Sequence, residues 1–338
     1  MPSTTGLPTR RGFLAMTAAA ASVAGRPLFA QTATGWGGAV DMARGFDQFH
    51  ALVISHRGET VLAERVRGPA LDRAVNVKSV SKTIVAAVLG AALDRGVAPG
   101  VDARLGDVAP SLIPSGADAR VRDITLGDLC TMQAGLERTS GSNYGSWVSS
   151  RNWVANALSR PMVAAPGSRM LYSTGSVHVL GAALSVASGE SLLAMTRDWI
   201  GRPLGIEVPA WTRDPQGYYL GGNEMALTPD AMIRFAEMYR RDGAGVLSNG
   251  WVRASLSRRT SSPFSGLDYG YGWFLGRSQG AQIALARGYG GQIIGFAPEL
   301  ELSFAITSDP TRPATSGGYF GDLMRLIDRE IIPAARMA

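Results

Sequence analysis

The sequence predicts an α+β fold, in which an antiparallel sheet is flanked by helices and a mainly helical region is inserted between its strands. Residues 49–67 alternate apolar and polar side chains about a glycine turn, a pattern typical of a β-hairpin. Residues 100–265 read mostly as helices broken by Gly and Pro, and strand patterns return after residue 270. Since a sheet must bury a face, the simplest packing joins the first and last strands into one sheet.

This packing predicts an α/β sandwich subdomain made of residues 36–95 and 265–338, with residues 96–264 as the helical insertion, together forming one unit. The apolar spacing and the breaks give the elements in chain order: strands at 50–55 and 60–66, a helix at 79–93, helices at 125–133, 147–158, 176–187, 192–200, 229–240 and 251–256, strands at 271–275, 281–287, 293–297 and 302–307, and a helix at 320–332. The helix at 79–93 is apolar on every side beyond its first turn, so we expect it to be buried.

Composition and charge restrict the class of protein. The chain has 338 residues, of which 46% are hydrophobic and 18% charged, as in a globular protein. The formal net charge is +6, but Arg10, Arg11 and Arg26 supply three of these charges before any acidic residue appears. The remaining charge, about +3, is too small to indicate a nucleic-acid partner.

The N-terminus carries an export pattern. Arg10 and Arg11 precede an apolar run from Phe13 to Ala24, and Ala30 follows as a small residue before a cleavage point. This predicts a Tat-type signal peptide over residues 1–30 and a bacterial periplasmic or secreted protein. The run is shorter than the ~20 residues that span a bilayer, so we expect no stable membrane insertion after its removal. A retained membrane anchor is the alternative.

The sequence indicates no metal site and no cofactor. His50, His56 and His178 are scattered without the spacing of metal ligands. Cys130 is the single cysteine, which excludes an intrachain disulfide, and its apolar surroundings are typical of a buried structural thiol.

Lysine is the most informative residue type. Only two of the 33 basic residues are lysines, and both lie in the segment from Asn76 to Lys82. Arginine stays protonated in proteins, whereas a buried lysine can lose its proton, so a rare lysine indicates proton transfer. Ser79 precedes Lys82 by three residues, the Ser-x-x-Lys spacing of a serine nucleophile and its lysine base. The alternative is a serine helix cap beside a chance charge.

Helix geometry explains why this spacing suits the chemistry. Residues three apart share a helix face, so Lys82 is expected to lie beside Ser79. The helix start stabilises negative charge through its unpaired N–H groups. Burial inside the apolar helix is expected to lower the pKa of Lys82.

Two further segments are candidates for the same site. Tyr172 follows a Pro-Gly turn and precedes a helix; near a lysine its pKa is expected to fall so that it can shuttle protons. The glycine-rich segment from Arg287 to Gln292 lies between two expected strands and allows close approach by a ligand. A backbone N–H there can complete an oxyanion hole with that of Ser79. The alternatives are a core tyrosine and a glycine bulge.

Together these segments resemble the serine β-lactamase and penicillin-binding-protein superfamily. The resemblance covers about residues 40 to 335 and is strongest to the class C-like branch, which includes family VIII carboxylesterases and 6-aminohexanoate-dimer hydrolases. Three motifs occur in the family's order: Ser79-Val80-Ser81-Lys82, Tyr172-Ser173-Thr174 and Tyr289-Gly290-Gly291. It implies a β-lactamase/transpeptidase-like fold and hydrolysis of a small-molecule ester or amide, cyclic amides included.

The resemblance also implies residue roles. Ser79 would be acylated, Lys82 would accept its proton, and Tyr172 would protonate the leaving group and help to activate the deacylating water. The backbone N–H groups of Ser79 and Gln292 would hold the oxyanion. The substrate would be bordered by Thr174, Tyr289, Gly290 and Gly291. Apart from the resemblance, the glycine- and serine-rich composition of loop 139–149 leads to the hypothesis that this loop, with Tyr144 and Trp147, borders the acyl pocket.

Two departures from the family motifs bear on the substrate. Thr174 stands where the family usually has Asn, and Tyr289 stands where β-lactamases have the lysine that binds the substrate carboxylate. Arg287 is expected to point to the opposite face of its strand and so not to replace that lysine. This favours an ester or amide of low charge over a β-lactam.

Three competing hypotheses remain. Gly276 to Gly280 fits the Gly-x-Ser-x-Gly elbow of α/β-hydrolases around Ser278, but a strand rather than a helix is expected to follow it. A non-catalytic binding protein on the same fold is the second hypothesis. A D-alanyl-D-alanine carboxypeptidase is the third, although the missing lysine counts against it.

Overall fold

The first and last parts of the chain form one sheet, as predicted. The structure is a computed structural model that describes residues 35–338, so the predicted signal peptide lies outside the described residues. The sheet has eight strands in the order β2-β1-β10-β9-β8-β7-β6-β5, and every neighbouring pair is antiparallel. The strands are β1 (Phe49–His56), β2 (Glu59–Arg65), β5 (Thr260–Ser261), β6 (Asp268–Tyr269), β7 (Phe274–Ser278), β8 (Ala281–Gly288), β9 (Gln292–Ala297) and β10 (Leu302–Ser308).

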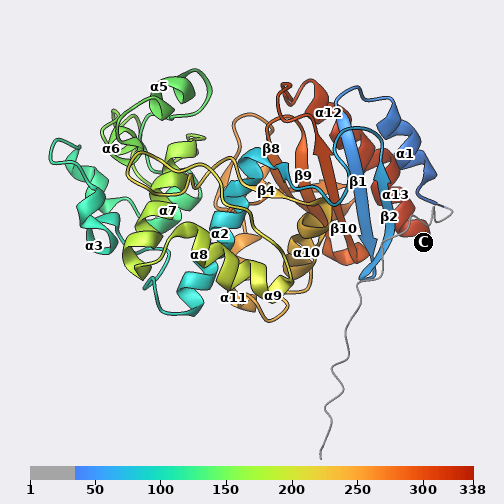
Figure 1. The fold of residues 1–338 in the computed structure, drawn as a ribbon, viewed down its shortest axis with the longest axis horizontal. Helices are drawn as coiled ribbons and strands as arrows, with labels where there is room; N and C mark the ends of the chain where they lie inside the picture. Colours follow the sequence, from blue (N-terminus) through green and yellow to red (C-terminus); the bar gives the residue numbers. More distant parts are fainter. Residues whose placement is uncertain (1–34) are drawn as a thin grey trace, which may run out of the picture.

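Helices cover both faces of this sheet, which explains why every residue of β9 and β10 is buried. Figure 1 shows α1 (Gly37–Arg44), α12 (Tyr319–Leu326) and α13 (Ile332–Met337) together on one side of the sheet. On the other side α10 (Pro229–Arg240) packs against β1, β9 and β10. Thus one helix of the predicted insertion belongs to the cover of the sheet.

The rest of residues 96–264 is mainly helical, but β5 falls inside the predicted insertion and joins the large sheet. Its helices are α3 (Leu105–Val108), α4 (Leu126–Cys130), α5 (Tyr144–Val148), α6 (Trp153–Leu158), α7 (Thr174–Ser188), α8 (Leu192–Met195), α9 (Arg202–Leu204) and α11 (Asn249–Ser255). A short second sheet pairs β3 (Val75–Asn76) with β4 (Ala226–Leu227). This pairing holds the segment before Ser79 against the chain that follows α9.

One predicted helix is wrong. The expected helix at 147–158 is two helices, α5 and α6, because Asn152 interrupts it and its side chain accepts a hydrogen bond from the backbone N–H of Ala155. Asx side chains favour such a cap over a helix interior. The break brings two indoles together, with the Trp147 Nε1–H donating to the carbonyl of Trp153 at 2.9 Å.

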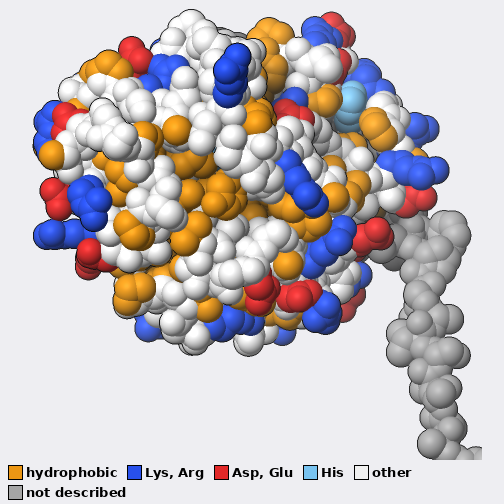
Figure 2. Space-filling view, turned by 60° about the vertical axis from the view of Figure 1, so that its left-hand side comes forward, with side chains coloured by type: hydrophobic (Ala, Val, Ile, Leu, Met, Phe, Trp, Pro, Cys, Tyr) orange, Lys and Arg blue, Asp and Glu red, His pale blue; other side chains and the backbone are white. Residues whose placement is uncertain are grey.

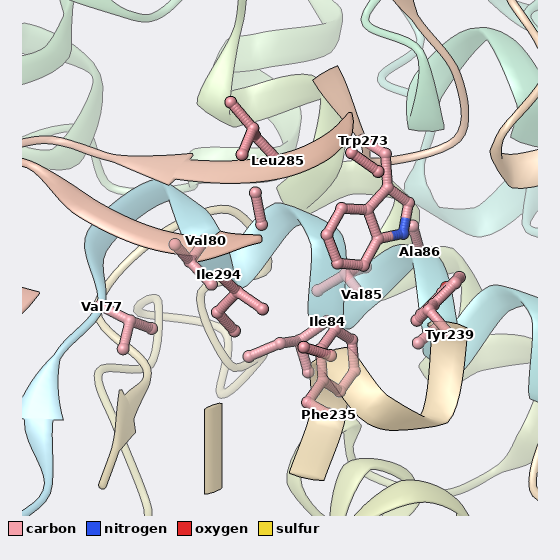
Figure 3. Packing of buried hydrophobic residues seen from close by; sticks show 14 of the residues in the cluster. Val77, Val80, Ile84, Val85, Ala86, Phe235, Tyr239, Trp273, Leu285 and Ile294 are labelled. Atoms are coloured by element: carbon pink, nitrogen blue, oxygen red, sulfur yellow. The ribbon is translucent and has the colours of Figure 1, made fainter. Parts of the chain in front are cut away.

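The buried helix predicted from residue 79 is α2 (Ser81–Asp94), preceded by a 3-10 turn at Lys78–Val80. Twelve of its fourteen residues are buried. Figure 3 shows Ile84 and Val85 of this helix among side chains of β8, β9 and α10. Burying each large aliphatic side chain contributes about 1.5–3 kcal/mol, so α2 is fixed between the sheet and the helical region.

Among residues 35–338, no single helix is both long and apolar enough to cross a membrane. The consecutive segments Thr174–Ser188 and Leu192–Leu204 reach that length only when joined, and they are bent by 87° relative to each other.

Candidate active site

A cavity of about 950 Å³ opens where the start of α2 meets the end of β8 and the loops of the helical region. Its wall includes five of the residues proposed from sequence: Ser79, Tyr144, Tyr172, Thr174 and Tyr289. Its other lining residues used below are Lys78, Arg138, Ser140, Asn223, Glu224, Phe264, Phe274, Arg287, Gly288 and Phe320. Figure 2 shows one face of the molecule, where apolar side chains gather across the middle and charged ones lie mostly around the rim.

Ser79 lies in the 3-10 turn just before α2, on a backbone that the neighbouring loop holds. Lys78 has a positive φ of 52°, an unfavourable conformation for a non-glycine residue, and its N–H donates to the Asn76 side chain at 2.8 Å. The Glu224 carboxylate accepts hydrogen bonds from both of these residues, at 3.1 Å from Lys78 Nζ and 2.6 Å from Asn76 Nδ2. These contacts hold the strained turn and orient Ser79 towards the cavity.

Lys82 lies directly behind Ser79 and is only 3% exposed. Its Nζ is 3.0 Å from Ser79 Oγ, 3.2 Å from Thr174 Oγ1 and 2.7 Å from the carbonyl oxygen of Gly222. Desolvation lowers the pKa of Lys82 to about 7, which confirms the expected direction. Near neutral pH the amine therefore has a lone pair available to the Ser79 hydroxyl.

Tyr172 lies beside this pair, with its ring centroid 5.0 Å from Lys82 Nζ. Its pKa is raised, first by desolvation, while interactions with Ser79 and with the charge of Arg287 lower it to a smaller extent. The expectation of a lowered pKa is therefore wrong, because burial outweighs both the hydrogen bond with Ser79 and the charge of Arg287. The phenol keeps its proton at neutral pH and can donate it.

Thr174 opens α7 and connects Lys82 with a second hydroxyl that sequence analysis missed. Ser140 Oγ lies 3.0 Å from Thr174 Oγ1 and accepts the Thr174 N–H at 2.9 Å. Thr139 Oγ1 accepts the next helix N–H, from Gly175, at 2.7 Å. The loop hydroxyls thus satisfy the first turn of α7, and the chain from Lys82 through Thr174 ends at Ser140 on the cavity wall. In the sequence, the pair Thr139-Ser140 in the glycine- and serine-rich loop was the available sign that hydroxyl groups line this site.

The segment at Gly222 forms another wall. A Cβ on Gly222 would lie 2.9 Å from Thr174 Cγ2 and 3.3 Å from Lys82 Nζ, so only glycine brings this carbonyl so close to the amine without displacing them. The next residue, Asn223, donates from Nδ2 to the Tyr144 hydroxyl at 3.0 Å. That hydrogen bond helps to hold Tyr144 at the cavity.

Trp147 does not line the cavity, although it was expected to border the substrate. Its side chain is fully buried and its ring centroid lies 5.5 Å from that of Trp153 and 5.7 Å from that of His178. It supports Tyr144 from behind, at a centroid distance of 5.7 Å.

The glycine-rich segment contacts the site through Gly288, one residue before the motif Tyr289-Gly290-Gly291. At the end of β8, a Cβ on Gly288 would lie 2.2 Å from the Val77 carbonyl oxygen and 3.2 Å from Lys78 Cβ. Gly288 therefore packs directly on the backbone that precedes Ser79. Tyr289 follows on the cavity wall and is 49% exposed.

Gly290, Gly291 and Gln292 are not among the lining residues of the cavity. The two glycines have φ of 84° and 98° and form the turn between β8 and β9, where positive φ is required. A Cβ on Gly290 would meet the carbonyl of Asp309 at 2.3 Å. Gln292 is fully buried, and its side-chain amide donates to the Ser308 carbonyl at 2.6 Å.

Arg287 lines the cavity, which corrects the expectation that it points away. Residues two apart on a strand share a face, and Arg287 and Tyr289 are both found on the cavity wall. The guanidinium carbon lies 4.0 Å from the ring centroid of Phe320 and 5.3 Å from that of Phe274. Desolvation lowers the pKa of Arg287 to about 10, so it remains charged at neutral pH.

Ser278 is remote from this chemistry. It ends β7 at a hairpin turn formed by Gln279 and Gly280, which have positive φ, and β8 follows instead of a helix. Its hydroxyl lies 2.8 Å from Asp328 Oδ1. The α/β-hydrolase elbow is therefore excluded. Within residues 35–338 there is also no group of three His, Cys, Asp or Glu side chains that could hold a metal ion.

The fold and the site define a class. A serine at the start of a buried helix, a desolvated lysine one turn later and a protonated tyrosine, set between an antiparallel sheet and a helical region, are the arrangement of β-lactamase-type serine hydrolases. Residues 48–328 match the family model described as Beta-lactamase, so the chain belongs to the beta-lactamase family. The predicted superfamily and fold are confirmed.

One curated relative matches part of this chain. The D-alanyl-D-alanine-carboxypeptidase/endopeptidase AmpH of Escherichia coli K12 is 29% identical over 186 residues, which are 53% of this chain and 47% of AmpH. The chain thus matches about half the length of this curated relative.

Two solved structures show the fold. EstCE1, described as a hydrolase with promiscuous acyltransferase activity, has a TM-score of 0.71 at 17% identity and covers 86% of this chain and 96% of its own. A protein from Bacillus anthracis described as a 6-aminohexanoate-dimer hydrolase has a TM-score of 0.72 at 16% identity, covering 86% of this chain and 80% of its own.

Proposed function

We propose that this serine hydrolase cleaves an ester or an amide through an acyl-enzyme on Ser79. The observation that carries the proposal is the 3.0 Å approach of Lys82 Nζ to Ser79 Oγ, at a site where burial lowers the pKa of Lys82 to about 7. A neutral amine at that distance is a competent general base.

The proposed acylation uses these groups in turn. Ser79 Oγ forms a bond to the substrate carbonyl carbon while its proton passes to Lys82 Nζ and the carbonyl π pair moves onto oxygen. When this intermediate collapses, the C–O or C–N bond breaks and its electron pair leaves with the alcohol or amine. Tyr172 donates its phenol proton to that group, and the Lys82 ammonium replaces the proton on Tyr172.

Deacylation uses the same groups in reverse. Water attacks the acyl carbon and gives a proton to the Tyr172–Lys82 pair, and Ser79 Oγ leaves and recovers its proton. The acid product is released with the site restored.

The oxyanion needs two N–H donors. Ser79 provides one from the helix start. For the second, the resemblance implies Gln292, but the position of the cavity favours the N–H of Tyr289. Gly288 packs on the backbone before Ser79 and Tyr289 lines the cavity, whereas Gln292 is not among its lining residues.

A carboxypeptidase acting on D-alanyl-D-alanine peptides is the second candidate. The resemblance to AmpH supports it, and the objection that no cation replaces the family lysine is weakened by Arg287 on the cavity wall. The hypothesis of a non-catalytic binding protein is disfavoured by the intact arrangement of Ser79, Lys82 and Tyr172.

The test is labelling with a fluorophosphonate together with hydrolysis of p-nitrophenyl acetate. We expect both with the wild type and neither with Ser79→Ala, while Ser278→Ala, which changes a serine outside the cavity wall, keeps both. Full esterase activity in Ser79→Ala would refute the assignment. Release of D-alanine from a D-alanyl-D-alanine peptide, and intact mass after exposure to penicillin, separate the carboxypeptidase from the simple esterase.

We also propose export through the twin-arginine pathway, on the evidence of Arg10 and Arg11 alone. Lysine at both positions is expected to leave the protein in the cytoplasmic fraction of its host. Unchanged periplasmic recovery would count against this pathway.

A further inference from the structure

The buried amine of Lys82 has few routes by which it can lose a proton to solvent. Among residues 35–338, its Nζ has three hydrogen-bond partners: the Ser79 hydroxyl at 3.0 Å, the Thr174 hydroxyl at 3.2 Å and the Gly222 carbonyl at 2.7 Å. A carbonyl oxygen only accepts hydrogen bonds, whereas a hydroxyl group both accepts and donates. Of these three partners, only the two hydroxyl groups can receive a proton from the amine and pass another one on.

Acylation removes the first of these two routes. In the acyl-enzyme the Ser79 oxygen is an ester oxygen without a hydrogen, so it no longer transfers protons. The Thr174 hydroxyl is then the one remaining partner of Lys82 that can do so. The route matters when a leaving group departs as an anion, because the proton that Lys82 took from Ser79 then stays on the amine. That ammonium must lose its proton before it can help to activate water.

The Thr174 hydroxyl connects the amine with the cavity. Ser140 Oγ lies 3.0 Å from Thr174 Oγ1 and accepts the Thr174 N–H at 2.9 Å, which fixes the two hydroxyl groups relative to each other. Thr174 is buried, whereas Ser140 is half-buried and lies on the cavity wall. Two short steps of 3.2 Å and 3.0 Å therefore lead from the buried amine to the solvent-accessible cavity.

We propose that Thr174 and Ser140 form a proton relay, which transfers a proton from Lys82 to the cavity while Ser79 is acylated. The ammonium gives a proton to Thr174 Oγ1, the Thr174 hydroxyl gives its own proton to Ser140 Oγ, and Ser140 gives its own to a water molecule or buffer base in the cavity. Each hydroxyl group keeps one hydrogen, and Lys82 becomes a neutral amine.

The relay rests on the proposed acyl-enzyme and specifies how its base is restored. It depends on a residue in which this chain departs from the family motif, since the usual asparagine has no hydroxyl group. In the free protein burial lowers the pKa of Lys82 to about 7, so the ammonium loses its proton readily at neutral pH.

Two other roles of these groups give different results. If Thr174 only positions Lys82, removing its hydroxyl slows acylation and deacylation alike. If Lys82 loses its proton through Tyr172 instead, removing the Thr174 hydroxyl does not slow deacylation selectively. A relay predicts a selective loss in deacylation, and only after a leaving group that departs as an anion.

The experiment compares p-nitrophenyl acetate with ethyl acetate, which give the same acetyl-enzyme. p-Nitrophenolate departs as an anion and leaves Lys82 protonated, whereas the ethanol product takes a proton from Tyr172, which Lys82 replaces. Thr174→Val keeps the shape of the side chain and removes its hydroxyl. With p-nitrophenyl acetate, stopped-flow kinetics should show the ratio of deacylation rate to acylation rate falling at least about 10-fold, so that acetyl-enzyme accumulates. Turnover of ethyl acetate is expected to fall much less.

Ser140→Val interrupts the second step and leaves every hydrogen bond of Lys82 in place, so a role in positioning Lys82 predicts no effect from it. The relay predicts the same selective loss as in Thr174→Val. The backbone of Ser140 is extended, with φ of −87° and ψ of 168°, which suits a β-branched residue. Thr174→Ser and Ser140→Thr keep the hydroxyl groups and are expected to restore the ratio of the two rates.

Thr139→Val is the matched control. The Thr139 hydroxyl also holds the first turn of α7, at 2.7 Å from the Gly175 nitrogen, but it is not a hydrogen-bond partner of Lys82. This variant is expected to keep the ratio of the two rates. Equal losses of both rates in Thr174→Val, equal losses on both esters, or a wild-type ratio in either the Thr174 or the Ser140 valine variant would overturn the relay.

Failure of the proposed function gives a different result. If the wild type hydrolyses neither ester, the acyl-enzyme proposal fails, and the relay is then decided by NMR of 15N-lysine-labelled protein. The chain has two lysines, so Lys78→Arg identifies the signal of Lys82. In Ser79→Val, whose methyl groups fill the position of the hydroxyl, adding Thr174→Val is expected to slow exchange of the Lys82 Nζ protons with water at least about 10-fold. Equal exchange rates would reject the relay.

Discussion

Burial acts in opposite directions on the pKa values of the two ionisable side chains beside Ser79. It lowers the pKa of Lys82 and raises that of Tyr172, because in each case the uncharged form is favoured. Near neutral pH the amine can therefore accept a proton while the phenol can donate one. A base and an acid are thus obtained from residues whose ordinary pKa values are both near 10.

The pH dependence of activity tests this directly. We expect kcat/KM for p-nitrophenyl acetate to rise with pH through about 7, as Lys82 loses its proton, and to stay high until Tyr172 ionises above its ordinary pKa. A profile flat between pH 5 and 9 would contradict the role of Lys82 as base.

The pH dependence of the free energy of unfolding should also report the lowered pKa of Lys82. Between pH 7 and 10.5 the unfolded chain binds a proton at Lys82 that the folded chain does not, so this group makes the free energy of unfolding rise with pH in that window. Relative to Lys82→Met, the wild type is expected to gain about 1.4 kcal/mol per pH unit there. Denaturant unfolding of both proteins at several pH values measures the difference, and a constant difference would show an unshifted lysine.

Tyr172 should matter most for poor leaving groups. Tyr172→Phe removes the proposed proton donor, which a p-nitrophenolate hardly needs but an alkoxide or amine requires. We expect kcat/KM to fall by about 10²–10⁴ for an alkyl ester and by much less for the p-nitrophenyl ester of the same acid. Equal losses on both would instead indicate a role in binding or positioning.

At this scale the sequence placed Lys82 beside Ser79, because lysine scarcity and helix spacing are local signals, whereas Tyr172 joined them through the resemblance to the family's ordered motifs. It did not place Ser140 or Arg287. The position of Ser140 depends on how a loop packs on α7, and that of Arg287 on where the β8–β9 turn falls. Neither packing is encoded in a nearby motif.

Among the elements, the loop that carries Gly222 is held by a buried pair. His178 Nε2 lies 3.1 Å from Asp214 Oδ2, and both side chains are fully buried. His178 Nδ1 accepts the Gly221 N–H at 3.4 Å, which places the ring proton on Nε2, facing Asp214. The pair thus anchors the backbone at Gly221, one residue before the Gly222 carbonyl that binds Lys82.

Asp214→Asn should disturb that anchor without changing its size. The new amide has two orientations. In one its NH₂ faces the Nε2–H of His178, so that two donors meet. In the other its carbonyl oxygen faces His178, and its NH₂ then faces the loop N–H groups that donate to Asp214. We expect a loss of about 1–3 kcal/mol in the free energy of unfolding and a lower kcat with little change in KM. Wild-type kcat would show that the pair does not position Lys82.

The end of β8 gives a second test. In Gly288→Ala the added Cβ would meet the Val77 carbonyl at 2.2 Å, so the strand or the Ser79 turn must shift. Activity is expected to fall at least about 100-fold, because a displacement of that size misaligns nucleophile and oxyanion donors. Gly116→Ala is the control, since no atom lies within 4 Å of its Cβ position. Equal activity of the two variants would contradict the close approach.

Elements with strong periodicity were predictable: α10 has the expected bounds, and β8, β9 and β10 lie within one residue of theirs. The helix at 147–158 was not, because a single Asn cap outweighed its apolar spacing. The expectation that Gly290 and Gly291 border the substrate failed for a similar reason, because a local pattern did not determine how the segment packs. Gly290 and Gly291 serve the turn, while Gly288, one residue before the motif, contacts the nucleophile's backbone.

For the whole molecule, the site exists only at the junction of its two parts. The sheet supplies Arg287 and Tyr289, the helical region supplies Tyr172 and Thr174, and α2 lies between them with Ser79 at its start. The sequence predicted this architecture because alternating and helical patterns are segregated along the chain. The cavity's charge could not be predicted, since it depends on side chains from distant segments meeting on one wall.

The central claim is that Ser79 is acylated. Intact-protein mass spectrometry after rapid acid quench of a reaction with p-nitrophenyl acetate, followed by peptide mapping, measures it directly. We predict one added acetyl group, located on Ser79, that forms more slowly in Lys82→Met and is absent from Ser79→Ala. An acetyl group on another residue, or an unmodified Ser79 in a protein that still turns over the ester, would contradict the account.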